Sequence, residues 1–355
     1  MEEKMKKNQN KSVFIGSLAA LILSVTLCCG LHPVWAKDKV YKWKMQVIWP
    51  EATMYSENTR QMVKRIKEAS NGRLDIKLFY ANQLVGTKEQ FNSLSMGVMQ
   101  MHIWPTVYGT GKIPASTFFF SIPGGFTSSD EFRAWFYSGG GLDIIRETYA
   151  RHGVHYIAPS FYPDNPARIS RDRAIASLAD FEGLKIRALP GLQSAVFKEL
   201  GASPMYLPVD EVYSGFDKGI VDALSGYTTY GWYKMGMHKI AKHISEPGFI
   251  MGTLGLEISA NKKAWDSLPD DLKLIVEMAS REMDMIASQA DLLASKDALG
   301  KMKSEGMQTQ VLSKEDIAKM GEVARKICDA YAEKDPISKK VWDSQKSMLK
   351  RLGKF

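Results

Sequence analysis

Residues 270–305 constrain the fold of this chain more than any other segment. They contain no proline and a single glycine, Gly300, which predicts one uninterrupted helix. At about 1.5 Å per residue such a helix reaches about 50 Å. It could therefore brace two domains or pair with a second subunit. Its apolar residues repeat at steps of four and three and predict a buried seam: Leu272, Val276, Ala279, Met283, Ile286, Ala290 and Leu293.

The chain before this helix alternates between strand-like and helix-like segments. Strands are predicted at 41–49, 74–79 and 101–107, with helices at 54–69 and 87–99 between them. The alternation restarts with helices at 128–137 and 142–152, strands at 154–161 and 184–189, helices up to 200 and at 209–218, and a strand from 221. Two last helices are predicted at 314–332 and 339–352. This order predicts an α/β fold with two units.

The N-terminus has the pattern of an export signal. Several lysines precede an uncharged, mostly apolar stretch at 12–31, and Val34 and Ala36 are small residues at the spacing of a cleavage site. We therefore expect residues 1–36 to be removed after Ala36 and the mature protein to lie in the periplasm. The apolar stretch is also long enough for a retained membrane anchor, and Cys29 offers a lipid anchor as a further alternative. Only Cys328 lies beyond the signal, which leaves no internal disulfide.

The sequence argues against several functional classes. It has no GxSxG, HExxH, P-loop or GxGxxG motif and no zinc-type cysteine and histidine spacing. Gly139–Gly141 could cradle a phosphate, although three glycines before a helix more often form a turn. The net charge of +8 comes from interspersed charges without a polybasic stripe, so nucleic acid is a poor candidate partner. These features favour a binding protein over an enzyme.

Arg187 is the main candidate for ligand binding. It ends an apolar strand and is followed by Pro190, Gly191 and a helix. In an open α/β sheet the carboxyl end of a strand faces the ligand crevice, and a guanidinium can pair with a carboxylate through two hydrogen bonds. The alternative is a surface arginine paired with a neighbouring acid. Arg168 is a similar candidate, but Arg171 and Arg173 lie close by.

Aromatic residues gather near the predicted strand ends, where they could line a ligand pocket. Ordinary core packing is the alternative for each of them. The candidates are Trp104, Tyr108, Tyr162, Tyr227 and Tyr230, with Trp49 and Trp232 nearby.

Several stretches resemble one known family when they are taken in order. They are Asn71-Gly72-Arg73-Leu74, the segment 177–187 (Ser-Leu-Ala-Asp-Phe-Glu-Gly-Leu-Lys-Ile-Arg), 200–204 (Leu-Gly-Ala-Ser-Pro) and Leu268-Pro269 ahead of the long helix. They are similar to the solute-binding component of tripartite ATP-independent periplasmic (TRAP) transporters, the DctP family. The resemblance extends over essentially the whole mature chain.

This resemblance implies a two-lobed periplasmic binding protein fold with the long helix bracing both lobes. Residues 37–164 plus 252–280 would form lobe I, and residues 165–251 plus 281–355 would form lobe II with the C-terminal helices. The lobes would close over a carboxylate ligand, with Arg187 as the arginine that pairs with it. Arg168 lies next to the place of a second family arginine.

Within the family, Tyr108-Gly109-Thr110-Gly111-Lys112 and 135–141 look most like the branch that binds 2-oxo and 2-hydroxy monocarboxylates. That branch carries a glutamate and a tryptophan where this chain has Ser225 and Gly226, and there a bound cation bridges ligand and protein. Glu257 is the remaining candidate ligand for Na⁺ or Ca²⁺, and one carboxylate rarely makes a site alone. The departure predicts no resident cofactor and a bulkier or aromatic acid beside Tyr227 and Tyr230.

The resemblance also implies partners and a function. We expect a non-enzymatic protein that delivers a small carboxylate to TRAP membrane subunits, as a monomer or as a homodimer through the long helix. The alternatives are a ligand-presenting subunit of a sensor kinase and a secreted enzyme on the same fold.

Overall fold

The computed structural model of the protein describes residues 39–120, 122–162, 168–246 and 253–354. The predicted signal peptide, with its cleavage site after Ala36, lies outside these residues. No helix within the described ranges combines the length and the apolar character that crossing a membrane requires. Residues 41–355 form one compact unit.

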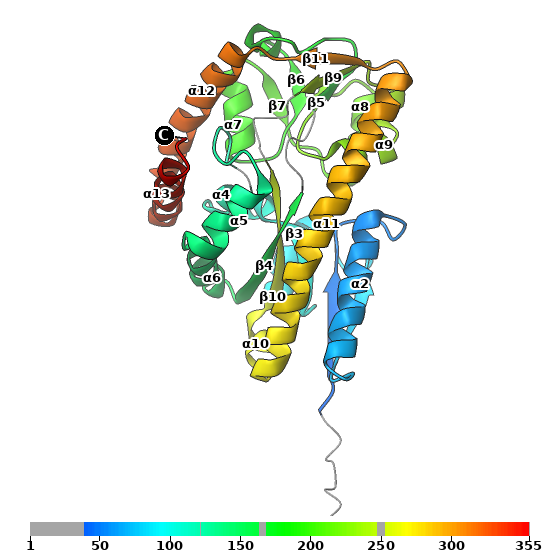
Figure 1. Ribbon diagram of the computed structural model, residues 1–355, viewed down its shortest axis with the longest axis vertical. Helices are drawn as coiled ribbons and strands as arrows, with labels where there is room; N and C mark the ends of the chain where they lie inside the picture. Colours follow the sequence, from blue (N-terminus) through cyan, green and yellow to red (C-terminus); the bar gives the residue numbers. More distant parts are fainter. Residues whose placement is uncertain (1–38, 121, 163–167, 247–252, 355) are drawn as a thin grey trace, which may run out of the picture. The chain divides into compact units, whose positions relative to one another are not determined.

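The first of two sheets in this unit has the strand order β2-β1-β3-β10-β4 (Figure 1). Its strands are β1 (Tyr41–Gln46), β2 (Leu74–Phe79), β3 (Met101–Pro105), β4 (Val154–Tyr162) and β10 (Leu254–Asn261). β1 runs parallel to β2 and β3, whereas β10 runs antiparallel to β3 and β4. Helix α2 (Met54–Ala69) crosses from β1 to β2. It starts at Thr53, whose side chain accepts a hydrogen bond from the Ser56 amide.

The second sheet has the order β11-β9-β5-β8-β6-β7. Its strands are β5 (Arg168–Ser170), β6 (Lys185–Arg187), β7 (Ser203–Met205), β8 (Ala223–Leu224), β9 (His243–Glu246) and β11 (Gln308–Val311). β6 is parallel to β7 and β8, and β5 is antiparallel to β8 and β9. The helices α7 (Leu192–Glu199), α8 (Val209–Asp217) and α9 (Thr229–Lys234) follow β6, β7 and β8 along the chain.

The long helix α11 (Asp270–Ser304) confirms the prediction of one uninterrupted helix. It packs against β4 of the first sheet, against α2, which connects two strands of that sheet, and against α9, which follows a strand of the second sheet (Figure 1). The predicted α/β class with a long helix bracing both halves is therefore confirmed.

The second half of the predicted seam on this helix is wrong. Leu272, Val276, Ala279 and Met283 are buried, but Ile286 and Leu293 are 43% and 69% exposed. A straight helix drifts by about 20° per heptad, so the buried face moves on to Ala287, Asp291, Ala298 and Met302. The outer face carries exposed Leu274, Met278 and Met285. The monomer and homodimer alternatives both stay predictions.

The remaining helices largely match the predicted segments. The matches are α5 (Ser129–Ser138), α6 (Gly141–Ala150), α12 (Lys314–Ala332) and α13 (Pro336–Arg351), whereas the short helix α10 (Lys262–Asp266) was not predicted. The helix predicted at 87–99 is shorter: the 3₁₀ turn η1 (Thr87–Glu89) leads into α3 (Gln90–Ser95), and the chain turns at Gly97, where φ is +80°. Only glycine adopts such a conformation without strain.

The C-terminal helices contact elements from both halves of the chain. α13 packs against α6 and α4 (Ser116–Phe120), and α12 packs against α7. The division into lobe I and lobe II at the predicted residue boundaries stays a prediction.

Candidate functional site

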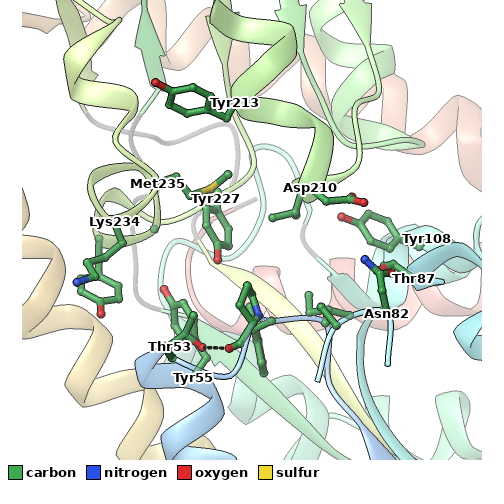
Figure 2. A pocket seen from close by; sticks show the side chains of 18 residues that line it. Thr53, Tyr55, Asn82, Thr87, Tyr108, Asp210, Tyr213, Tyr227, Lys234 and Met235 are labelled. Carbon is green, nitrogen blue, oxygen red and sulfur yellow. Dashed lines mark hydrogen bonds between the residues drawn. The ribbon is translucent and has the colours of Figure 1, made fainter. Parts of the chain in front are cut away.

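A cavity of about 480 Å³ is enclosed by segments that belong to the two sheets. The loop from β1 to α2 and the loop after β2 form one side, and α8 and α9 form the other (Figure 2). A second, smaller cavity of about 30 Å³ shares five of its lining residues: Ile48, Trp49, Tyr108, Val209 and Tyr227. The two cavities therefore form one candidate site, and we refer to the larger one as the main cavity.

Aromatic side chains supply much of the cavity wall. Tyr55 lies at the centre of this group, with its ring 5.1 Å from that of Trp49, 4.9 Å from Tyr162 and 6.0 Å from Tyr230. Burial raises the pKa of Tyr227, and the Asp291 carboxylate adds to the effect. The phenol is therefore neutral at physiological pH and acts as a hydrogen-bonding group on an otherwise apolar surface.

The structure brings most of the predicted aromatic residues to this site. Tyr108, Tyr227 and Tyr230 line the main cavity, and Tyr162 lines the smaller one. Trp104 is not among the lining residues of either. It is 1% exposed, its indole nitrogen donates to the Thr87 carbonyl at 2.9 Å, and its ring lies edge-on to Tyr108 at 5.8 Å. Trp104 thus packs against Tyr108 on the side away from the cavity.

Arg187 occupies the last position of β6, as expected, and is only 1% exposed. Its Nε donates to the Leu207 carbonyl at 3.2 Å, and Nη1 donates to the carbonyls of Ser225 at 2.7 Å and Gly226 at 3.3 Å. None of the described residues accepts a hydrogen bond from Nη2, and no described carboxylate pairs with this guanidinium. Neutral backbone oxygens therefore hold a buried cation in place.

Ser225 and Gly226 lie beside this arginine. Gly226 lines the smaller cavity and has a φ of +86°. A Cβ added there would meet Leu189 at 2.8 Å and Arg187 Nη1 at 3.0 Å, so the glycine allows Arg187 to approach the backbone. The Ser225 hydroxyl lies 3.2 Å from Gln193 Nε2, which donates to it. These contacts place Arg187 directly behind the wall of the smaller cavity.

Arg168 lies elsewhere. It begins β5, is 1% exposed, and its guanidinium sits 5.6 Å from the centre of the Phe181 ring. Burial lowers the pKa of Arg168 to about 10, which still leaves it cationic at neutral pH. It is not among the residues that line either cavity. Its predicted role in ligand binding stays a prediction.

Glu257 is buried inside the first sheet and both of its oxygens are occupied. Oε1 lies 2.6 Å from His102 Nε2, and Oε2 accepts from the Tyr149 hydroxyl at 2.6 Å. Within the described ranges, no cluster of three or more His, Cys, Asp or Glu side chains is arranged to hold a metal ion. A hard cation prefers several carboxylate and carbonyl oxygens. Near Arg187 the described oxygens include the Ser225 hydroxyl and the carbonyls that accept from the guanidinium, and the Glu257 carboxylate is hydrogen-bonded to His102 and Tyr149.

Sequence reasoning missed part of the cavity wall. Ile48, Thr53 and Tyr55 come from the end of β1 and the start of α2, and Asn82 follows β2. The signal was available, because parallel strands direct their carboxyl ends to the ligand side of a sheet. Asp210 at the start of α8 and Lys234 at the end of α9 add two charges to the lining (Figure 2).

Comparisons with known proteins identify the family to which this chain belongs. The model of the family described as "Bacterial extracellular solute-binding protein, family 7" (DctP) matches residues 45–335. A monocarboxylate 2-oxoacid-binding periplasmic protein from Nostoc sp. is 29% identical over 313 residues, which covers 88% of this chain and 85% of the Nostoc protein.

Two solved structures of TRAP periplasmic solute-binding proteins are also similar. One, from Colwellia psychrerythraea with bound calcium and pyruvate, is 28% identical with a TM-score of 0.80. The other, from Pseudoalteromonas atlantica with bound sodium and pyruvate, is 27% identical with a TM-score of 0.80. Each match covers 88% of this chain and 95% of the other.

Proposed function

Because the chain belongs to family 7 of the bacterial extracellular solute-binding proteins, the DctP family of TRAP transporters, we propose that it captures a small organic acid anion in the periplasm. It then delivers the anion to the membrane subunits of a TRAP transporter. The family works by binding, so the proposal includes no chemical step. The predicted family membership is confirmed by the family match over residues 45–335.

One observation carries this proposal: Arg187 is a buried cation whose hydrogen bonds go to neutral carbonyls. Holding a charge away from water without an opposite charge is costly. A ligand carboxylate that reached Nη2 would supply that charge and a charge-assisted hydrogen bond. The site therefore favours an anion over a neutral compound.

Capture follows from the same electrostatics. In an open arrangement of the two halves, water would solvate Arg187 and the ligand carboxylate. Closure removes that water and strengthens the pair, because electrostatic attraction increases as the local dielectric constant falls. The ligand thereby shifts the population toward the closed form, which the membrane subunits would recognise.

We propose that the ligand is a 2-oxo or 2-hydroxy monocarboxylate, or a bulkier, aromatic carboxylate. The similar Nostoc protein binds 2-oxoacids by name, and the two similar structures hold pyruvate. The main cavity of about 480 Å³ supports the bulkier acid, since pockets of roughly 300–1,000 Å³ hold drug-sized ligands. Tyr227 and Tyr230 offer ring faces and hydroxyls to the body of such an acid.

We further propose that this chain binds the carboxylate directly through Arg187 and not through a bridging cation. The two similar structures contain calcium or sodium together with pyruvate. In this chain Glu257 is already hydrogen-bonded to His102 and Tyr149, and Ser225 offers only a neutral hydroxyl.

Calorimetric titration of the mature protein tests both proposals. Pyruvate, lactate and their aromatic counterparts, phenylpyruvate and phenyllactate, would each be titrated beside the matching neutral amide. We expect at least one carboxylate to bind and its amide not to bind, with the same affinity in sodium-free buffer containing EDTA. Equal binding of acid and amide would contradict anion recognition. Loss of binding on cation removal would contradict the direct contact.

A further inference from the structure

Three helices or their caps meet at one buried carboxylate, that of Asp291. Its Oδ1 accepts a hydrogen bond from the Tyr55 hydroxyl at 2.5 Å and from the Thr228 hydroxyl at 3.2 Å. The two hydroxyl oxygens lie 2.9 Å apart. Tyr55 belongs to α2, Thr228 caps α9, and Asp291 lies on α11. Asp291 Oδ1 therefore links α2, which packs with the first sheet, to the cap of α9, which follows a strand of the second sheet.

The hydroxyl of Thr228 completes this network. It accepts the hydrogen bond of the Gly231 amide and thereby caps the first turn of α9. Its own proton goes to Asp291 Oδ1. One turn further along α11, the Ser295 hydroxyl lies 3.4 Å from Asp291 Oδ2 and accepts from the Tyr230 amide at 3.2 Å. The cap and the second residue of α9 are thus both hydrogen-bonded to α11.

Burying the Asp291 carboxylate costs free energy. Asp291 is 0% exposed, and burial raises its pKa to about 6 against the lowering effect of its hydrogen bonds. The titratable groups that face it are the phenols of Tyr55, Tyr162, Tyr227 and Tyr230, all of which are neutral. An apolar residue at this position would avoid the desolvation cost, but it would not hold the hydroxyls of Tyr55, Thr228 and Ser295 in fixed directions.

The network lies directly against the main cavity. Tyr55 and Tyr230 line it, and α9 also contributes Gly231 and Lys234. Figure 2 shows Tyr55 and Thr53 on the α2 side, opposite the α9 side that carries Lys234. The distance between α2 and α9 therefore sets the width of the cavity.

We infer that Tyr55, Thr228 and Asp291 form a clasp between α2 and α9, with Asp291 as the positioning residue that sets the separation of the two cavity walls. All three residues meet at α11, which packs against elements of both halves, so the clasp fixes the walls where they adjoin that helix in the open and in the closed arrangement. The inference does not depend on which compound the cavity takes. The long helix then has a specific role: α11 carries the Asp291 carboxylate, which accepts hydrogen bonds from both α2 and the cap of α9 and so fixes their relative position.

Distances between spin labels in the ligand-free mature protein test the clasp. Lys64 in α2 and Lys239, five residues after α9, are exposed and can be changed to cysteine for nitroxide labelling. Cys328 is buried, and burial raises the pKa of its thiol, so it stays unlabelled. Tyr55→Phe removes one hydroxyl and keeps the ring that stacks on Trp49. We expect a narrow distance distribution in the unsubstituted protein and a broadened one, extended to longer distances, in Tyr55→Phe.

Three further variants distinguish a specific clasp from a general loss of rigidity. Tyr162→Phe removes a hydroxyl from the neighbouring ring, 4.9 Å from Tyr55, and should leave the distribution narrow. Asp291→Asn keeps an acceptor oxygen and should resemble the unsubstituted protein, whereas Asp291→Leu should broaden the distribution as Tyr55→Phe does. Should Asp291→Leu fail to unfold cooperatively, Tyr55→Phe decides. An unchanged distribution in Tyr55→Phe, or equal broadening in Tyr162→Phe, would overturn the clasp.

Discussion

Replacing Arg187 with alanine is expected to lower the affinity for the carboxylate ligand by about 2–5 kcal/mol, roughly 30-fold to several thousand-fold. The variant loses the cation that faces the bound anion and leaves the ligand carboxylate buried without an opposite charge. Arg187→Lys keeps the charge, but one ammonium group cannot replace the planar fork whose Nε and Nη1 donate to Leu207 and Ser225 and leave Nη2 for the ligand, so an intermediate loss is expected. Calorimetric titration of the three proteins with the acid that binds most tightly measures both effects.

Arg171→Ala provides the matched control for this comparison. Arg171 also donates to two backbone carbonyls, those of Phe216 at 2.5 Å and Asp217 at 2.8 Å, but neither acceptor lines a cavity. Arg187, by contrast, donates to Gly226, which lines the smaller cavity. Removal of Arg171 should leave the ligand affinity unchanged. Circular dichroism and cooperative thermal unfolding would establish that each variant is folded. An affinity of Arg187→Ala equal to that of Arg171→Ala would refute the role of Arg187.

Gly226→Ala is expected to destabilise the protein and to weaken ligand binding together. The left-handed backbone at Gly226 costs a non-glycine residue about 1–2 kcal/mol, and the overlap of the new methyl group with Leu189 and Arg187 adds about 1–3 kcal/mol. Because Arg187 Nη1 donates to the Gly226 carbonyl, relief of the overlap moves the guanidinium away from its bonding position. Chemical denaturation measures the first effect and calorimetry measures the second.

The effect of the backbone alone can be measured at Gly183. This glycine has a φ of +67°, and a Cβ added there would meet no atom within 4 Å. Gly183→Ala should therefore lose only about 1–2 kcal/mol of stability through backbone strain and keep the ligand affinity of the unsubstituted protein. If Gly226→Ala binds as tightly as Gly183→Ala, the close approach of Arg187 to Gly226 does not matter for binding.

The sequence predicted the parts of the fold that depend on regular patterns. Strands 41–46 and 74–79 and helix 54–69 alternate or repeat clearly, and the run without proline from residue 270 marks α11. Most strands of the second sheet were missed because β5 and β7 have only three residues each and β9 and β11 have four, whereas β8 lies within the strand predicted from residue 221. A segment that short shows no period, and its position is fixed by pairing with strands far away in the chain.

The candidate site was predicted unevenly for a related reason. Arg187 was identified because it follows an apolar strand, and Tyr108, Tyr227 and Tyr230 because aromatic residues cluster there. Asp291 was missed, since a hydrophobicity pattern assigns aspartate to the outside of a helix. Its burial depends on hydroxyls from Tyr55 and Thr228, which lie 236 and 63 residues away in the sequence. Only the packed structure brings these partners together.

Mass spectrometry of the ligand that copurifies with the mature protein tests the central claim most directly. The unsubstituted protein and Arg187→Ala would be purified in parallel without harsh washing, denatured, and the released small molecules compared. We expect an acid with a free carboxylate in the unsubstituted protein and its absence from Arg187→Ala. The size of the acid would distinguish a three-carbon oxo-acid from an aromatic one. Release of a neutral or cationic compound, or of equal amounts of the acid from both proteins, would contradict this expectation.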